Sequence, residues 1–315
     1  MTDYAIDLTP PDIRPYRIGN VGIDYVLRFV SPAPGPHVLL TAIVHGNELC
    51  GAIALDFLLR KNLQPRRGAL TLAFCNVAAY QSFDPGQPTA SRFVDEDFNR
   101  IWSPQMLDGP RNSTELARAR ALRPVVDATD FLLDLHSMQH RTAPLTLCGP
   151  LEKGRVWARR IGYPALIVSD KGHAAGARMR DYGGFGVATS AKNALLVECG
   201  QHWEKASAEV AIETTLRVLV DLGTLAAADA APYLPSAPRP AARIIEVTDA
   251  VTIRTDHFAF AQDFQGLEVL PKKGSVLGHD GDLLVVTPYD DCVLIMPSQR
   301  LHKGQTAVRL GRFIA

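Results

Sequence analysis

The stretch VLLTAIVHGNE, residues 38–48, decides the predicted fold and points to the predicted site. Residues 38–44 are apolar apart from one threonine, which is typical of a strand buried on both faces. His45 and Glu48 follow where the chain is expected to leave the strand for a helix, and Gly46 is expected to permit a sharp turn. A histidine and a carboxylate placed in this way can converge on zinc. Alone, this spacing is usually a surface pair, so the interpretation depends on further partners.

Apolar strand-like runs alternate with helical patterns through the first 226 residues. Strands are expected at residues 25–30, 38–44, 69–77, 130–135, 145–148, 165–169 and 194–198. Helices are expected at residues 49–60, from 113 or 114 to about 122, and at 203–222. Pro124 is expected to end the second of them. This alternation predicts an α/β fold with a mostly parallel or mixed sheet flanked by helices.

The composition changes after residue 226. Residues 227–242 are rich in alanine and proline, which is typical of a linker. Residues 243–315 alternate short β-like runs with turns, which predicts a small all-β domain. The expected organisation is an α/β domain at 1–226, a linker at 227–242 and a β domain at 243–315.

Charge and cysteine content narrow the class of protein. The 315-residue chain has 33 basic and 33 acidic side chains, a balance that argues against nucleic-acid and membrane-surface partners. No stretch has the length and apolarity of a membrane helix, and the N-terminus lacks signal-peptide features. The five cysteines are widely spaced without a Cys-x-x-Cys motif, which indicates free thiols and a cytoplasmic location. The oligomeric state is left open, with a homo-oligomer allowed by symmetry statistics alone.

Two further polar residues follow apolar runs. His136 is the expected third zinc ligand, and Asp134, on the same face of its strand, is expected to orient the imidazole. Glu198 ends another run, where burying a carboxylate is costly unless it has a partner or a role. Because ligands bind beyond the carboxyl ends of parallel strands, His45, His136 and Glu198 are expected to share one site. The alternatives are a histidine bonded to backbone and a glutamate paired with arginine or lysine.

Four motifs, HGNE at 45–48, DFNR at 97–100, DLH at 134–136 and ECG at 198–200, occur in this order. In order and spacing they resemble the succinylglutamate desuccinylase/aspartoacylase family, a branch of the zinc carboxypeptidase-like hydrolases. The resemblance spans about residues 38–200. It implies one Zn2+ per chain and a general acid/base at Glu198. The implied zinc ligands are His45, Glu48 and His136.

The segment RFVDEDFNR, residues 92–100, combines two arginines and an asparagine with several acids. Such groups suit a fork that grips a carboxylate and polarises a carbonyl. The alternative is a solvated charge run in which the aspartates hold the arginines. The resemblance implies that Arg92 polarises the scissile carbonyl, and that Asn99 and Arg100 hold the α-carboxylate of the substrate.

The chain departs from the family pattern at one position. Aspartoacylases proper carry another arginine about ten residues before the catalytic glutamate, where this chain has Ala188. Either Arg178 or Arg180, in the preceding glycine-rich loop, replaces it, or the substrate has a neutral or basic side chain. Tyr182 in this loop either contacts substrate or packs in the core.

The leading functional hypothesis is a zinc-dependent amidohydrolase, a deacylase acting on a small N-acyl amino acid or a related carboxylate-bearing amide. It would use zinc-activated water and Glu198 as the general base. One alternative is a metallocarboxypeptidase acting on short peptides, which the family's β domain disfavours because it narrows the site. Another is a zinc-binding protein without turnover.

The remaining histidines receive no role. His202 lies four residues after Glu198, and it is not assigned to the pocket. Four others are expected at the surface: His37, His257, His279 and His302.

Overall fold

The structure is a computed structural model that describes residues 4–172 and 175–314. Its main sheet contains the strands β1 (Val26–Val30), β2 (His37–Ala42), β3 (Ala69–Phe74), β4 (Phe131–Met138), β5 (Leu145–Leu147), β6 (Leu166–Ser169), β7 (Asn193–Gln201), β8 (Arg243–Thr252), β10 (Val269–Leu270), β13 (Cys292–Ile295) and β14 (Thr306–Ile314). These eleven strands are ordered β1-β3-β2-β4-β7-β5-β6-β8-β14-β13-β10. A second, antiparallel sheet holds β9 (Phe258–Phe260), β11 (Val276–Asp280) and β12 (Leu283–Val286).

The centre of the main sheet is parallel. β3, β2, β4 and β7 pair in parallel, and every residue of these four strands is buried. Such strands need apolar side chains on both faces, which explains their runs of Leu, Val, Ala and Phe. β1 and β5 join the sheet in antiparallel orientation. The predicted mixed α/β sheet with a small C-terminal β sheet is therefore confirmed.

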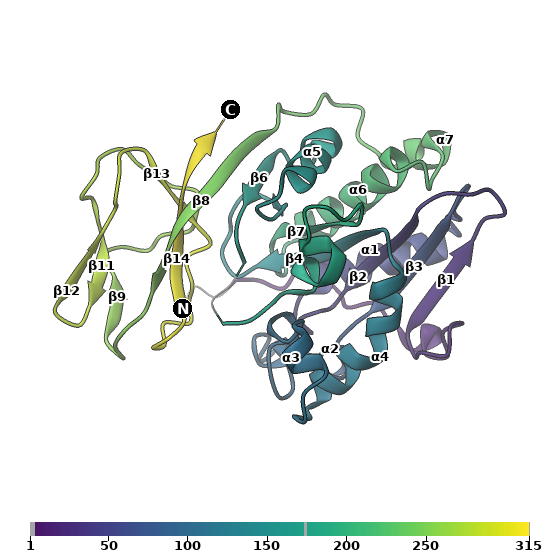
Figure 1. Cartoon of the computed structure of the whole chain (residues 1–315), viewed down its shortest axis with the longest axis horizontal. Coiled ribbons are helices and arrows are strands. Elements are labelled where there is room, and N and C mark those ends of the chain that lie inside the picture. Colours follow the sequence, from purple (N-terminus) through teal and green to yellow (C-terminus); the bar gives the residue numbers. More distant parts are fainter. Residues whose placement is uncertain (1–3, 173–174, 315) are drawn as a thin grey trace.

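Helices cover both faces of this sheet (Figure 1). The helices are α1 (Leu49–Arg60), α2 (Val77–Gln81), α3 (Pro104–Leu107), α4 (Thr114–Ala128), α5 (Glu152–Ile161), α6 (Lys205–Asp221) and α7 (Ala227–Ala230). Leu40 and Leu133 pack in a core with α1, α5 and α6, whereas their neighbours Leu39 and Leu132 pack in a core with α3 and α4. Short 3-10 turns are η1 (Arg14–Tyr16), η2 (Ala90–Arg92), η3 (Phe98–Arg100), η4 (Met179–Asp181), η5 (Gly183–Gly186) and η6 (Ala231–Tyr233).

The prediction that Pro124 ends its helix is wrong, because α4 continues to Ala128. A proline inside a helix removes one backbone hydrogen bond and crowds the preceding turn. Leu122 and Val126 flank it on the same face of the helix, and each is only 2% exposed. Burial of these side chains offsets the missing bond, so tertiary packing overrides the local signal.

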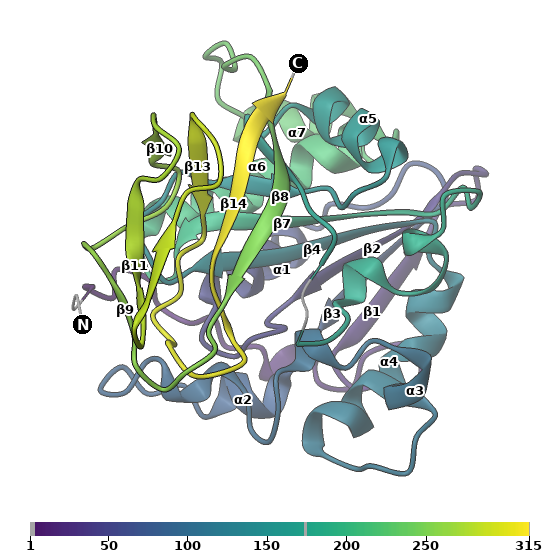
Figure 2. The ribbon, with the colours of Figure 1, turned by 60° about the vertical axis from the view of Figure 1, so that its left-hand side comes forward.

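The C-terminal strands continue the main sheet (Figure 2). β8 pairs in parallel with β6, from Leu166 opposite Arg243 to Ser169 opposite Glu246, and β14 then pairs with β8. The first part of the predicted linker forms α7 and η6. The division into a catalytic and a β domain stays a prediction, since backbone hydrogen bonds join the two segments. Within the described residues, no helix is both long and apolar enough to cross a membrane.

Candidate metal and substrate site

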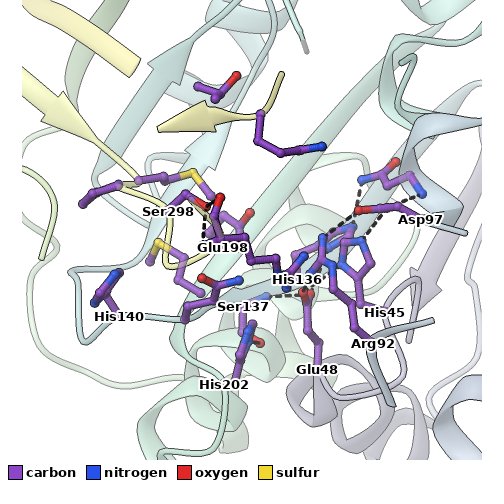
Figure 3. A pocket seen from close by; sticks show the side chains of 18 of the residues that line it. His45, Glu48, Arg92, Asp97, His136, Ser137, His140, Glu198, His202 and Ser298 are labelled. Carbon is purple, nitrogen blue, oxygen red and sulfur yellow. Dashed lines mark hydrogen bonds and ion pairs between the residues drawn. The ribbon is translucent and has the colours of Figure 1, made fainter. Parts of the chain in front are cut away.

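The predicted site residues lie near the carboxyl ends of three neighbouring strands. His45 follows β2, and Glu48 is the residue that precedes the first turn of α1. His136 on β4 is in register with Glu198 on β7, both inside their strands rather than at the predicted ends. Figure 3 shows His136 between His45 and Glu198. The strand order β2-β4-β7 therefore brings the four side chains to one place.

His45, Glu48 and His136 form one compact group. The Nδ1 atoms of His45 and His136 lie 2.8 and 2.9 Å from the two carboxylate oxygens of Glu48. On the far side of each ring, Nε2 lies 2.9 Å from a second carboxylate, Asp97 for His45 and Asp134 for His136. The predicted partnership between Asp134 and His136 is thus confirmed. Each imidazole is held at both nitrogens, which fixes its orientation.

This donor set fits a zinc ion. One candidate ligand atom from each of His45, Glu48 and His136 lies within 4.8 Å of the other two, and all three residues are buried. A carboxylate that binds the second ring nitrogen of a histidine is the usual support for a metal ligand. Burial raises the pKa of Glu48, but both imidazoles outweigh this effect and hold the pKa well below its usual range. An ionised carboxylate and two oriented imidazoles are the ligands that a catalytic zinc takes.

A cavity of about 440 Å³ opens beside this group, within the range of small-molecule sites. One part of its wall is polar and comes from the strand ends and from the segment 92–100. Another part comes from the β13–β14 connection. Its lining includes His45, Glu48, Arg92, Asp97, Asn99, Arg100, His136, Ser137, Met138, Leu147, Arg178, Leu196, Glu198, His202, Met296, Arg300, His302 and Arg309.

Arg92 and Glu198 both line the cavity (Figure 3). Arg92 donates to Asp97 at 3.0 Å and to Glu48 at 3.3 Å, so an aspartate of the segment does hold this arginine. Glu198 is 6% exposed, and its Oε2 atom has no hydrogen-bond partner in the described part of the chain. Burial and the nearby charge of Glu48 raise the pKa of Glu198 to about 8. Among the described residues, no arginine or lysine forms the ion pair with Glu198 that was the alternative interpretation.

Asn99 and Arg100 line the cavity from η3. The side-chain oxygen of Asn99 accepts from the backbone N–H of Met179 at 2.9 Å, and its amide nitrogen lies 3.5 Å from Nε2 of His136. The Arg100 guanidinium donates to the carbonyl of Asn99 at 2.7 Å. Burial lowers the pKa of Arg100 to about 10. The charge of Asp97 opposes this effect, and the charges of neighbouring arginines add to it. An anion beside Arg100 would offset this cost.

Arg178 also lines the cavity, but protein carboxylates hold it. It donates to both oxygens of Asp170 at 2.8 Å and to Asp181 at 2.6 Å. Its side chain is 2% exposed, and that of Asp170 is 1% exposed. A buried bidentate pair of this kind leaves Arg178 without a surplus charge for a ligand.

The structure does not bring Arg180 or Tyr182 to the cavity. Arg180 donates to the backbone carbonyl of Cys148 and to Asp181, away from the histidines. The hydroxyl of Tyr182 accepts from Arg123 at 2.9 Å, and its ring packs in the core. Tyr182 therefore packs in the core, as one of the two alternatives predicted. Neither Arg180 nor Tyr182 is placed to contact a substrate in the cavity.

The comparisons with known proteins agree with this geometry. The sequence profile of the succinylglutamate desuccinylase/aspartoacylase catalytic domain matches residues 34–221. The chain belongs to this family. It is therefore a hydrolase of the deacylase or aspartoacylase type. No curated protein matches the chain by sequence.

Solved structures share the fold of this family member at low sequence identity. Succinylglutamate desuccinylase from Vibrio parahaemolyticus gives a TM-score of 0.69 at 16% identity, covering 93% of this chain and 87% of that one. A succinylglutamate desuccinylase/aspartoacylase from Rhodobacter sphaeroides gives 0.63 at 20%, covering 92% and 88%. The product-bound ectoine utilization protein EutE (DoeB) from Ruegeria pomeroyi gives 0.61 at 17%, covering 91% and 87%.

Sequence reasoning gave no role to several residues that line the cavity of this desuccinylase/aspartoacylase-family chain. His202 is 2% exposed, and its Nδ1 lies 2.8 Å from the hydroxyl of Ser137. The sequence did offer one signal for His202: it lies four residues after Glu198, directly after the end of β7. Arg300 and Arg309 come from the C-terminal segment, where no local pattern marks them. His302 is exposed as expected but also lines the cavity.

One expectation about local structure needs correction. His37 is buried rather than at the surface, and its ring nitrogens contact the Ala128 carbonyl at 3.0 Å and the Thr71 hydroxyl at 2.8 Å. The chain does turn at Gly46, where the N–H of Glu48 donates to the carbonyl of His45 at 3.2 Å, and glycine is needed there for space. A Cβ there would lie 2.3 Å from the backbone of Ala79 and 2.4 Å from the carbonyl oxygen of Ser91. Glycine thus lets α2 and η2 approach the loop that carries His45 and Glu48.

Proposed function

We propose that this family member is a zinc-dependent amidohydrolase that removes the acyl group from a small N-acyl amino acid or a related carboxylate-bearing amide. The observation that carries the proposal is the arrangement at the strand ends. A buried carboxylate, Glu198, has an oxygen without a partner among the described residues and faces the same cavity as His45, Glu48 and His136. A burial cost of this kind is typical of a group that works on a ligand.

Each cavity residue has a part in the proposed hydrolysis. Zinc held by the two histidines and Glu48 would supply Lewis acidity toward water and the carbonyl oxygen. Glu198 would take a proton from the attacking water and later pass it to the leaving amine nitrogen as the C–N bond breaks. Arg92 would stabilise the negative charge that develops on the carbonyl oxygen.

Asn99 and Arg100 would orient the substrate by holding its α-carboxylate. The Arg100 guanidinium has no carboxylate partner among the residues that the structure describes, so a substrate carboxylate supplies the missing acceptor. Fixing one end of the substrate places the scissile amide beside Glu198 and Arg92, which reduces the entropic cost of reaction.

The test is a panel of N-acetyl, N-formyl and N-succinyl amino acids incubated with zinc-loaded and chelator-treated protein, with amine release measured. Zinc-dependent cleavage of at least one member is expected. Absence of cleavage across the panel, with zinc bound, would contradict the proposal. Peptides of increasing length belong in the same assay, because the β13–β14 connection lines the cavity and favours small substrates. Activity that rises with peptide length would favour a carboxypeptidase.

A further inference from the structure

We propose that His202 and Trp203, the two residues that directly follow β7, are positioning residues that hold the proposed zinc ligand Glu48 in place. This inference rests on the proposed function, since it concerns the same zinc site. It adds two residues that lie outside the four family motifs. It also gives a role to Gly200, which closes the ECG motif and takes no part in the proposed hydrolysis.

A β-bulge in β7 turns His202 away from the face of the sheet that carries Glu198. Between His136 and Met138, β4 advances by two residues. Over the same stretch β7 advances by three, from Glu198 to Gln201, so β7 holds one extra residue. Side chains alternate between the two faces of a strand, and one extra residue reverses that alternation. His202 therefore points to the opposite face from Glu198, although four residues separate them.

Gly200 makes this bulge possible. Its φ angle is 111°, a backbone conformation that residues with a side chain rarely adopt. A Cβ at this position would meet no atom closer than 4.0 Å, so the backbone angle calls for glycine and the available space does not. The glycine of the ECG motif thus sets the direction of the chain after β7.

On the opposite face His202 holds Ser137, the residue that follows the proposed ligand His136. Its Nδ1 atom lies 2.8 Å from the Ser137 hydroxyl, and its backbone N–H donates to the carbonyl of Met138 at 2.9 Å. His202 is 2% exposed and Ser137 is 4% exposed, so water does not compete for the contact between them. The end of β7 thus fixes the end of β4 at Ser137.

Ser137 in turn orients Glu48. Its backbone N–H donates to Oε2 of Glu48 at 3.0 Å (Figure 3). Among the described residues, the other groups at this carboxylate are Arg92 and the Nδ1 atoms of His45 and His136. Those Nδ1 atoms are the nitrogens left for zinc, because carboxylates hold the Nε2 atoms. The Ser137 N–H is therefore the contact at Oε2 that does not compete with the metal.

Trp203 holds the backbone that leads into Glu48. Its indole N–H donates to the carbonyl of Asn47 at 3.2 Å. The ring is 5% exposed and packs in the core with α1 and α6, and the Trp203 carbonyl accepts from the N–H of Asp7 at 3.0 Å. His202 and Trp203 thus reach Glu48 by two routes, its carboxylate and its backbone. Residues that orient a ligand in this way raise metal affinity.

The test separates the two ring nitrogens of His202. His202→Asn places an amide near the position of Nδ1 and can keep the bond to Ser137, whereas His202→Gln places the amide near Nε2 and loses that bond. Zinc affinity is measured by competition with a chelating dye, without substrate. His202→Gln should weaken zinc binding about 10- to 100-fold, and His202→Asn should stay close to the parent value.

Ser137→Ala removes the hydroxyl but keeps the N–H that Glu48 accepts. It should weaken zinc binding as much as His202→Gln, and the double variant should bind no more weakly than either, because both changes remove the same bond. Trp203→Phe, which lacks the indole N–H, should also weaken zinc binding. His279→Gln is the matched control, since His279 is exposed on β11 and does not line the cavity, and it should change nothing.

Unchanged zinc affinity in His202→Gln would overturn the inference. Equal losses in the Asn and Gln variants would overturn it too, because they would assign the role to Nε2, which has no partner among the described residues. Circular dichroism in urea checks that each zinc-free variant is folded, and Ser137→Ala decides the inference where a His202 variant is not. A parent protein that binds zinc but cleaves no amide would contradict the proposed function and leave this test intact, whereas one that binds no zinc would overturn both.

Discussion

Glu198 is the residue whose replacement tests the chemistry most directly. We expect Glu198→Gln to lower kcat by about 10²- to 10⁴-fold, because the amide cannot take a proton from water. Zinc content, measured by atomic emission, should stay at the parent value, since Glu198 is not among the three proposed ligands. Glu209→Gln, at an exposed position of α6, serves as the control. A Glu198→Gln variant that keeps most of its activity would contradict the role.

Asp170 sets a pH dependence of stability. Burial opposes its ionisation, but Arg178 outweighs burial and holds the pKa of Asp170 well below its usual range. The stabilisation is therefore fully present above the unfolded-state pKa of about 3.9 and is lost as pH falls toward the lower native-state value.

Asp170→Asn should lower the free energy of unfolding by about 3–5 kcal/mol at pH 7, because it breaks a buried pair. The difference from the parent protein should be the same at pH 7 and pH 5 and smaller at pH 3.5. Urea titrations at the three values measure it. A destabilisation by Asp170→Asn that grows as the pH falls would contradict this pH dependence.

At the level of elements, α4 positions the segment that leads to Asp97. Glu115, in the first turn of α4, is fully buried and accepts from the backbone N–H groups of residues 94, 95 and 96 at 2.7, 3.0 and 3.2 Å. It also accepts from the Asn76 side chain at 3.0 Å. One carboxylate thus joins α4, the end of β3 and the approach to η3.

Glu115→Gln should reduce the free energy of unfolding by about 2–4 kcal/mol, because an amide N–H would face backbone donors. It should also weaken zinc binding through misplacement of Asp97. Urea unfolding and zinc competition with a chelating dye measure the two effects. Glu152→Gln, in the first turn of α5 with a side chain 65% exposed, should change neither. Unchanged zinc affinity in Glu115→Gln would show that Glu115 does not affect the zinc site through Asp97.

Elements with a strong local signal were predictable from the sequence. α1 begins and ends where its apolar pattern indicates. His45 and Glu48 could be grouped with His136 because the first two follow a buried strand and the third lies within one. α4 was cut short in the prediction, because the packing around Pro124 is a tertiary effect. Arg300 could not be found, since its place depends on how β14 pairs with β8 and on the path of an irregular connection.

For the molecule as a whole, zinc is expected to act as a stabilising ligand. Its proposed ligands lie on the β2–α1 connection and on β4, so binding would join two parts of the sheet. Free zinc at 100-fold above Kd should add about 2.7 kcal/mol to the free energy of unfolding. Thermal unfolding with and without a chelator measures the shift in Tm. His136→Ala should abolish it, and a shift retained in this variant would locate the zinc elsewhere.

The hydrogen bonds between β6 and β8 have a consequence for engineering. A chimaera that exchanges everything after residue 242 with a relative must reproduce the register of Leu166 against Arg243. Otherwise β8 will not form its backbone hydrogen bonds with β6. Grafting only residues 296–305 avoids that demand, because this loop begins after β13 and ends before β14. Substrate preference should therefore be transferable as a short cassette, with the hydrolytic machinery left in place.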